Sequence, residues 1–444
     1  MKKIIALLLC LTFVLGVLAA CNKPEEPPVV EPDDKNTETP AVDDDPNKNE
    51  NQGKPEDKVE SGPVLDLTGV EPIRYTRLGE DYQYLVGKDR VSKFLNEPKE
   101  SFLGVCKYFD DSSYELYGYN EMGNVLSATY VKGDAMMHVY WIGGEMNELC
   151  LVNSKTGAAT LPPKTPEVMT GDSDTIVTQM RALERANTKI NGMGYVVKLA
   201  DGSFLIYDGG YEVRLDELWD TLTTLNGGEE GIVIRAWLLT HPHGDHYPCF
   251  IAFSSVYASK VTLERLLISP ASVEDYKSDF NNGVIEKAVS KFTGAQILYV
   301  HTGMVLNFCD VKMEILCTAD EIYYDGASDD QNNSSIVSRV YKEGGKSVMF
   351  LGDAGDDIST RLIPMYGEYL KSDICQAAHH GVEDFTIEAY RLIRSEIWLY
   401  PCDTSLYNNP QRDAEVREEI KNAEYTEKIY RHDTRTRPEL SLNK

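Results

Sequence analysis

Four potential metal ligands stand within six residues, directly after an apolar run, and they constrain the fold more than any other part of the sequence. Residues 232–239 read Ile-Val-Ile-Arg-Ala-Trp-Leu-Leu, which is typical of a buried β-strand. The run leads into a loop that holds His241, His243, Asp245 and His246. Imidazole and carboxylate are ligands that zinc prefers, and a loop leaving a strand can aim several side chains at one point. The alternative is a histidine-rich surface loop, but only 8 of the 444 residues are histidine.

Residues 1–20 are expected to be a signal segment. Two lysines precede an apolar run at 4–17 that is too short to span a membrane comfortably. The run ends in Leu-Ala-Ala-Cys at 18–21, which resembles the processing site of bacterial lipoproteins. The resemblance implies removal of the signal, lipid on Cys21, and anchoring at the extracellular face of the cell membrane. An ordinary signal peptide with an incidental cysteine is the alternative.

Residues 21–60 are expected to form a disordered tether. From residue 22 to residue 60 there are 7 prolines, 13 acidic residues, 5 lysines and no aromatic residue. Such a segment buries too little apolar surface to offset the entropy lost on ordering. We therefore expect it to hold the folded part away from the membrane surface.

The rest of the chain divides into two regions. Short β-branched and aromatic runs separated by turn signals predict a small β-rich accessory module at 61–165. Strands and helices then alternate, which predicts a second domain at 170–440 with two sheets between helical layers. This fold class is α+β.

Charge and cysteine content narrow the functional classes. The net charge is −27, and because polyanion binding usually requires a basic patch, broad nucleic-acid binding is not expected. Without Cys10 and Cys21, seven cysteines remain, an odd number with no Cys-x-x-Cys pair. We interpret several of them as small buried apolar residues rather than a disulfide framework.

The sequence His-Pro-His-Gly-Asp-His at 241–246 resembles the H-x-H-x-D-H signature of the metallo-β-lactamase superfamily. Three further matches follow that family's order: Asp208-Gly-Gly, Gly352-Asp353 and His379-His380-Gly. The resemblance covers residues 175–435. It implies a four-layer αββα sandwich, here preceded by the β-rich module and the disordered tether.

The resemblance also implies a site for two divalent metal ions, with zinc expected and manganese as the alternative. His241 and His243 would ligate the first ion, and Asp245 and His246 the second. Asp353 would bridge both ions, and His379 would be the terminal ligand. The implied ligands are thus His241, His243, Asp245, His246, Asp353 and His379. Asp208 is expected to orient a ligand or loop rather than to bind metal itself.

Of the adjacent pair, we favour His379 as ligand because it lies at the strand end, and we assign His380 to the substrate. The family usually supplies a third histidine to the first metal, but His301 lies within an apolar run and is interpreted as structural. The Asn-rich run at 331–335 resembles the ComEC-like, phosphodiesterase-type branch, and Asn333 is a candidate substrate contact or weak ligand. Cys249 is expected in the core and His432 on the surface.

The function implied by this resemblance is metal-dependent hydrolysis at the cell surface. A metal-bound hydroxide would attack the substrate, with Asp245, Asp353 and His380 as catalytic residues. A phosphoester, most simply a phosphodiester, in a small molecule or a surface polymer is the first choice of substrate, because of the branch resemblance. Hydrolysis of a β-lactam, lactone or other ester ranks lower. The alternative of another class is a non-catalytic, surface-binding lipoprotein whose metal domain is degenerate.

Overall fold

The computed structural model describes residues 63–155, 157–167, 174–180, 183–185, 188–190, 192–271, 283–322, 331–381, 385–432 and 438–443. The predicted signal, the predicted tether and Cys21 lie outside these residues. Residues 60–444 form one structural unit. No helix in the described ranges combines the length and hydropathy that a membrane crossing requires.

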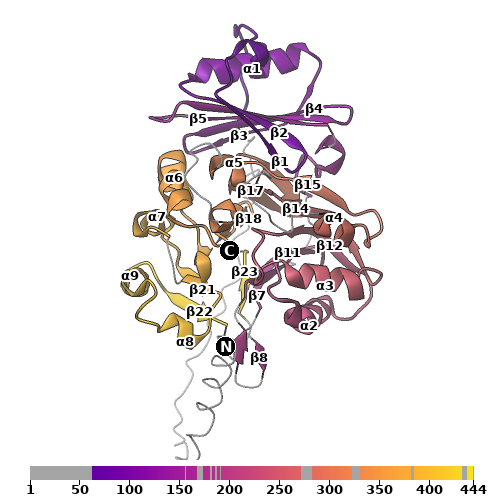
Figure 1. Cartoon of the computed structure of the whole chain (residues 1–444), viewed down its shortest axis with the longest axis vertical. Coiled ribbons are helices and arrows are strands. Elements are labelled where there is room, and N and C mark those ends of the chain that lie inside the picture. The colour runs from indigo at the N-terminus through magenta and orange to yellow at the C-terminus, as the bar shows by residue number, and fades with distance from the viewer. Residues whose placement is uncertain are drawn as a thin grey trace, which may run out of the picture. The chain divides into compact units, whose positions relative to one another are not determined.

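The N-terminal region is an antiparallel sheet with one long helix, seen in indigo and purple in Figure 1. Among the described strands the sheet order is β1-β2-β6-β5-β4-β3. These elements are β1 (Tyr82–Val86), β2 (Asp89–Phe94), α1 (Lys99–Asp111), β3 (Glu115–Met122), β4 (Val125–Lys132), β5 (Ala135–Ile142) and β6 (Glu148–Ser154). The short strands expected in this region are present, whereas α1 was not predicted.

This sheet is covered on both faces. Alternate side chains of each strand point to opposite faces and so enter different cores. Leu149 and Leu151 pack with the apolar side of α1, including Phe102. Cys150 and Val152 face the other way and share a core with residues of the C-terminal domain. The N-terminal sheet is therefore covered by a helix on one face and by the rest of the protein on the other.

The second sheet carries the predicted histidine loop. Its order among the described strands is β15-β14-β12-β11-β10-β7-β23, with β13 also paired to β12. Strands β11, β12, β14 and β15 run parallel to one another. The strands are β7 (Ile176–Gln179), β10 (Gly194–Lys198), β11 (Phe204–Asp208), β12 (Ile232–Leu238), β13 (Val261–Leu263), β14 (Arg265–Ile268), β15 (Gln296–Tyr299) and β23 (Glu439–Ser441). Helices α2 (Leu215–Asn226), α3 (Pro248–Val256) and α4 (Val284–Val289) cover its outer face.

The third sheet has the order β16-β17-β18-β19-β20-β21-β22 in the described part of the chain, and β19 to β22 are parallel. Its strands are β16 (Val305–Phe308), β17 (Val311–Cys317), β18 (Val337–Tyr341), β19 (Ser347–Phe350), β20 (Ile374–Gln376), β21 (Ile397–Tyr400) and β22 (Lys428–Arg431). The accompanying helices are α5 (Ala319–Ile322), α6 (Asp356–Tyr366), α7 (Ile387–Ile393), α8 (Thr404–Tyr407) and α9 (Ala414–Asn422). A separate pair of short strands is formed by β8 (Leu183–Arg185) and β9 (Thr188–Ile190).

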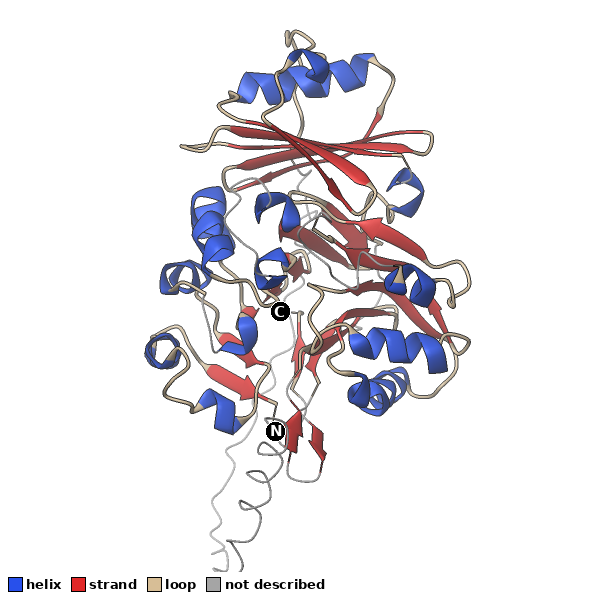
Figure 2. Cartoon of the chain, in the orientation of Figure 1, coloured by secondary structure: helices blue, strands red, loops and turns tan. Residues whose placement is uncertain are grey.

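The second and third sheets pack face to face. Tyr207 of β11 stacks on Phe350 of β19 with ring centroids 3.8 Å apart, and Tyr195 of β10 contacts the same ring. Aliphatic side chains from both sheets complete this inner core. With helices outside each sheet, the arrangement is the expected four-layer αββα sandwich within an α+β fold (Figure 2).

Candidate metal centre

The predicted site residues gather at the carboxyl ends of parallel strands from both inner sheets. Asp208 ends β11, and the loop from His241 to His246 follows β12. Asp353 follows β19, and His380 follows β20. The carboxyl ends of parallel strands are where open α/β sheets place their ligand sites, and here two such edges meet. Gly352 permits the close approach, because a Cβ at this position would lie 2.9 Å from Ser335 and 3.1 Å from Thr240.

Four imidazole nitrogens converge on one carboxylate oxygen. The Nε2 atoms of His246, His380, His241 and His379 lie 3.1, 3.6, 3.8 and 4.0 Å from Oδ2 of Asp353. The Asp353 side chain is only 2% exposed, so this convergence takes place inside the protein. A buried carboxylate surrounded by imidazole nitrogens is the donor set that zinc and similar ions take.

His246 is held in the orientation that a metal ligand needs. Its Nδ1 donates to Oδ2 of Asp208 at 2.8 Å, which leaves Nε2 directed at Asp353. Asp208 is itself fixed by the Thr240 backbone N–H and hydroxyl, both at 2.8 Å. A carboxylate on the far nitrogen sets the tautomer and the ring direction of a metal-binding histidine. Asp208 therefore holds the orientation of His246, and the role of His246 as a metal ligand stays a prediction.

His241 presents a buried nitrogen with no hydrogen bond. Its Nδ1 lies 3.1 Å from the Thr240 hydroxyl and 3.3 Å from the Ser335 hydroxyl. Its Nε2 and Oδ1 of Asp353 are both buried and lack a hydrogen-bond partner among the described residues. Buried polar atoms without partners are costly, and a bound cation would satisfy both. The donor set therefore fits a metal ion.

Two overlapping groups of candidate ligands share His246. His241, His246 and Asp353 form one group, and Asp245, His246 and His380 form the other. Within each group the ligand atoms lie within 4.8 Å of one another. Two neighbouring groups are compatible with the predicted pair of ions.

The distances favour His380 over the predicted His379 as the terminal ligand. Nε2 of His380 lies 3.0 Å from Oδ2 of Asp245, and its Nδ1 donates to the Pro401 carbonyl at 2.8 Å. Nε2 of His379 is farther from Asp353 and lies 3.4 Å from the Asn332 amide. The backbone explains the reversal, because both histidines adopt left-handed conformations, with φ of 44° for His379 and 58° for His380. This turn directs the second histidine inward, so the distances favour an exchange of the two expected roles, and which histidine binds metal stays a prediction.

The contacts of His243 and Asn333 do not assign either residue to the two ligand groups. The half-buried ring of His243 lies beside that of His241, with centroids 4.7 Å apart, but His243 belongs to neither group. Its role as a ligand stays a prediction. Asn333 accepts from the Gly355 backbone N–H at 2.9 Å and donates to Asp357 at 3.1 Å. The amide thus holds the loop that follows Asp353, and a contact with substrate stays a prediction.

The pKa shifts within the cluster indicate which side chains carry charge when no cation is bound. Burial disfavours charge on His246, but Asp353 and Asp208 outweigh it and hold the pKa of His246 well above its usual value. Burial likewise opposes ionisation of Asp353, but His246 and His380 hold the pKa of Asp353 well below its usual range. The pKa of His241 is depressed by burial and by the neighbouring His246, so this imidazole is neutral. Without metal, protons on histidine thus balance the carboxylates.

Ser335 and Thr240 are contributors that sequence reasoning missed. The Ser335 hydroxyl accepts from the Asp353 backbone N–H at 3.0 Å and approaches His241, so it joins the two loops. The Thr240 hydroxyl joins Asp208 to His241 in the same way. Thr240 directly precedes the signature and Ser335 ends the Asn-rich run, which is the signal that could have identified them.

The remaining histidines and Cys249 lie elsewhere. His301 is buried between Asp89 and Asp320, each 3.1 Å away, which agrees with a structural role. Cys249 is buried in the core beneath the helices of the second sheet, as expected. The expectation of a surface position for His432 is wrong, because this residue is 1% exposed. Its polar neighbours suggested exposure, but its backbone N–H bonds to the Cys402 carbonyl, which draws it inward after β22.

A third acidic group is a poor metal site. Glu167, Asp201 and the Cys309 thiol lie close together. Asp201 is already paired with Arg235 at 2.7 Å. Burial raises the pKa of the Cys309 thiol to about 12, which disfavours the thiolate that metals bind.

Comparisons with known proteins add a distant likeness of fold. No family model and no curated protein matches the chain. The metallo-β-lactamase fold protein YhfI from Bacillus subtilis is 14% identical, with a TM-score of 0.39 over 60% of this chain and 99% of its own. Zn²⁺-bound PqqB from Methylobacterium extorquens is 10% identical, with a TM-score of 0.38 over 60% and 99%. CmlA, a diiron β-hydroxylase from Streptomyces venezuelae, is 12% identical, with a TM-score of 0.37 over 72% and 76%. At these identities and TM-scores, no activity is carried over to this chain.

Proposed function

We propose that this protein is a metal-dependent hydrolase of the metallo-β-lactamase type that cleaves phosphoester bonds at the cell surface. The observation that carries the proposal is the convergence of four histidine Nε2 atoms within 4.0 Å of Oδ2 of Asp353. His241, His246, His380, Asp245 and Asp353 would hold two divalent ions, with zinc expected. When bound, such ions lower the pKa of a water molecule and stabilise negative charge on the reacting group.

The protein's own residues supply orientation and proton handling. Asp208 and the Pro401 carbonyl fix the δ-nitrogens of His246 and His380, so that both Nε2 atoms point into the site before any ligand arrives. This preorganisation avoids reorganisation when a charged ligand binds. Asp245 is 26% exposed while Asp353 is buried, so Asp245 is the carboxylate that a substrate or solvent molecule would reach first.

The choice of a phosphoester rests on the sequence resemblance of residues 331–335 and 379–381 to the phosphodiesterase-type branch. A second argument comes from His301, the histidine closest to the place of the usual third ligand. One ring nitrogen of His301 is bonded to Asp89 of β2 and the other to Asp320 of α5, so His301 does not complete a β-lactamase-like first metal site. His379 would contact a substrate oxygen, and its 18% side-chain exposure supports this role.

The test is metal content and phosphodiesterase activity of one preparation, with a matched pair of variants. Metal is measured by plasma emission spectrometry and hydrolysis with bis-p-nitrophenyl phosphate. Asp353→Asn removes the central charge, whereas Asp356→Asn makes the same change three residues along, at an exposed position at the start of α6. We expect about two metal ions per chain in the wild type and in Asp356→Asn. Asp353→Asn should lose metal, and its rate should fall at least about a hundredfold.

Equal background rates in all three proteins, with no bound metal, would reject the hydrolase and favour a binding lipoprotein with a degenerate site. Bound metal with turnover of lactones or β-lactams but not of the phosphodiester would retain the hydrolase and reject the substrate class.

The extracellular, lipid-anchored location is proposed from the sequence at 18–21. A Cys21→Ser variant expressed in a bacterial host should move from the membrane fraction to the soluble exported fraction, and it should lose incorporation of labelled fatty acid. Equal membrane association and equal labelling of both proteins would contradict lipidation at Cys21.

A further inference from the structure

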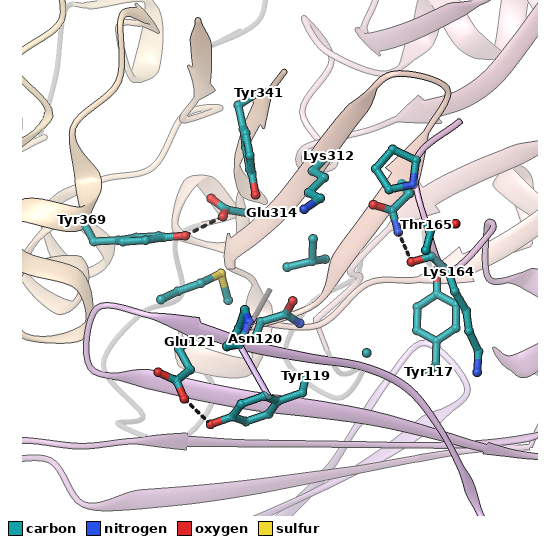
Figure 3. A pocket seen from close by; sticks show the side chains of 16 residues that line it. Tyr117, Tyr119, Asn120, Glu121, Lys164, Thr165, Lys312, Glu314, Tyr341 and Tyr369 are labelled. Atoms are coloured by element: carbon teal, nitrogen blue, oxygen red, sulfur yellow. Dashed lines mark hydrogen bonds between the residues drawn. The ribbon is translucent and has the colours of Figure 1, made fainter. Parts of the chain in front are cut away.

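A pocket of about 360 Å³ lies between the N-terminal sheet and the third sheet (Figure 3). Its walls come from β3 and from β16 to β18, together with residues 164–166. Strands β3 and β16 are the terminal strands of their sheets in the described part of the chain. None of the candidate metal ligands lines this pocket, so it is a second site.

Three tyrosine rings face the pocket from different sides. Tyr117 comes from β3, Tyr341 ends β18, and Tyr369 follows α6 (Figure 3). The ring of Tyr119, also on β3, instead packs toward Phe102 of α1. The hydroxyl of Tyr117 donates to the Pro162 carbonyl at 2.9 Å and that of Tyr369 to Glu314 at 2.6 Å. Because these hydroxyls are fixed, the rings are held still at little further entropic cost when a ligand packs against them.

Three charged residues of the pocket already have charged partners, whereas Glu121 accepts a hydrogen bond from Tyr119. Lys164 pairs with Glu115, and Lys312 pairs with Glu343. Glu314 pairs with Arg339 at 2.7 Å. An ionic ligand would have to compete with these pairs, so the pocket is suited to a neutral ligand.

The polar atoms of the pocket floor accept hydrogen bonds. Asn307 uses its amide N–H₂ on the Lys164 and Pro163 carbonyls at 2.7 and 3.2 Å. Its carbonyl oxygen is buried and has no hydrogen-bond partner in the described part of the chain, although the residue is only 7% exposed. Glu314 is 2% exposed and adds carboxylate oxygens beside it. A buried acceptor without a partner calls for a donor from a ligand.

We propose that this pocket binds a neutral saccharide of a surface polymer. Sugar hydroxyls donate hydrogen bonds to Asn307 and Glu314, and the apolar C–H face of a sugar ring packs on tyrosine. A volume of about 360 Å³ lies in the range of small-molecule sites. A peptide strand added to an edge is disfavoured at β3, because the register shift between Leu116 and Gly118 interrupts that strand.

The test is direct binding, which is independent of catalysis. The folded chain from residue 22 is titrated calorimetrically with neutral trisaccharides (cellotriose, maltotriose, xylotriose and tri-N-acetylchitotriose) and with an extended hexapeptide of alternating threonine and valine. At least one trisaccharide should bind. Combining Tyr117→Ala with Tyr341→Ala should weaken that binding at least about tenfold, since each lost ring contact accounts for about threefold to tenfold.

Tyr82→Ala is the matched control, because Tyr82 is 42% exposed on β1, at the opposite end of the same sheet. It should bind as the wild type does. Tyr341→Phe keeps the ring and should retain most of the affinity, which separates loss of the ring from misfolding. Binding of no trisaccharide, equal binding by the double variant, or binding of the hexapeptide alone would overturn the proposal. Failure of the phosphodiesterase assay would leave these binding results unchanged.

Discussion

At the scale of single residues, Asp208 supports the candidate metal centre through His246 and Thr240. It accepts three hydrogen bonds, from the Thr240 backbone, the Thr240 hydroxyl and His246. Asp208→Asn should keep the fold but lower metal affinity about tenfold to a hundredfold, because His246 loses its carboxylate partner. Competition with a chromophoric chelator measures this change. Asp216→Asn, at an exposed position in α2, should bind metal as the wild type does, and equal affinities in both variants would contradict the assignment.

Metal binding should release protons. Asp353 and Asp208 outweigh burial and hold the pKa of His246 well above its usual value, so its ring is protonated at neutral pH in the metal-free chain. A cation at Nε2 displaces that proton, and metal affinity therefore falls as pH decreases. Calorimetric titrations at pH 7 in buffers of different ionisation enthalpy should give at least about one proton released per chain. Heats that are independent of the buffer would contradict this protonation state.

The free energy of unfolding should also depend on pH through His301, which stabilises the folded state while it is protonated. Burial disfavours its charged form, but Asp320 and Asp89 prevail and raise the pKa of His301 from 6.5 to about 10. The stabilisation is complete below about pH 6.5 and is lost as pH rises toward about 10. His301→Gln should lower the free energy of unfolding by about 3–5 kcal/mol at neutral pH, since it leaves buried carboxylates unpaired. In urea denaturation the difference from wild type should shrink at high pH, and a constant difference would contradict the linkage.

The clustering of the candidate metal ligands was predictable because much of their spacing is local. Histidines separated by one intervening residue after a buried strand can be read from sequence, as can an acid directly after another strand. The order of His379 and His380 could not be read, because it depends on a left-handed turn that histidine seldom adopts. The burial of His432 depends on a contact with residue 402, distant in sequence, and no local pattern encodes it.

At the scale of elements, the N-terminal sheet is part of one cooperative structure. Lys93 of β2 is fully buried and pairs with Glu321 of α5 at 3.1 Å. Arg361 of α6 joins the same carboxylate at 2.5 Å and also pairs with Glu148 of β6. Tyr140 of β5 donates to Glu321 at 2.5 Å. These groups are satisfied only when the N-terminal sheet and the C-terminal domain are together.

Deleting residues 63–155 should therefore prevent folding rather than yield a trimmed enzyme. The deletion exposes the apolar residues that now face β5 and β6, and it leaves Glu321 and Arg361 without their partners on the N-terminal sheet. We expect aggregation, or loss of near-ultraviolet circular dichroism with retained secondary structure. A soluble C-terminal fragment that unfolds cooperatively would contradict this expectation.

The elements that sequence reasoning missed are instructive. Helix α1 places Phe102, Val105, Cys106 and Phe109 in the core, and this spacing of three, four and seven residues is visible in the sequence. Strands β16 and β17 are different, because polar residues such as Asn307 interrupt their apolar alternation. Those polar residues line the pocket between the two sheets. Their positions follow from tertiary contacts and not from the local alternation of a strand.

At the scale of the whole molecule, the chain should be insensitive to redox conditions. The seven cysteines from Cys106 to Cys402 are buried, and the structure shows no disulfide among its described residues. The melting temperature should be the same with and without dithiothreitol. Ellman's reagent should react slowly with the native chain and with about seven thiols after denaturation, if residues 1–21 are omitted. A large drop in melting temperature under reducing conditions would indicate disulfides.

The four-layer architecture was predictable because four motifs occur in a fixed order, each after an apolar strand. The sharing of one core between the N-terminal sheet and the C-terminal domain was not predicted, since turn signals mark strands but do not show what covers their faces. Strand β6 has apolar residues on both faces, and this is the sequence feature that indicates burial on both sides.

The turn at 379–381 suggests how this chain would respond to laboratory evolution. Each non-glycine residue in a left-handed conformation costs about 1 kcal/mol or more, and His379 and His380 stand there in succession. A library selected for heat resistance alone should accumulate glycine or asparagine at these two positions. The same library selected for turnover should retain histidine at 380. Diverging outcomes of the two selections would measure how much stability the chain gives up to keep its chemistry.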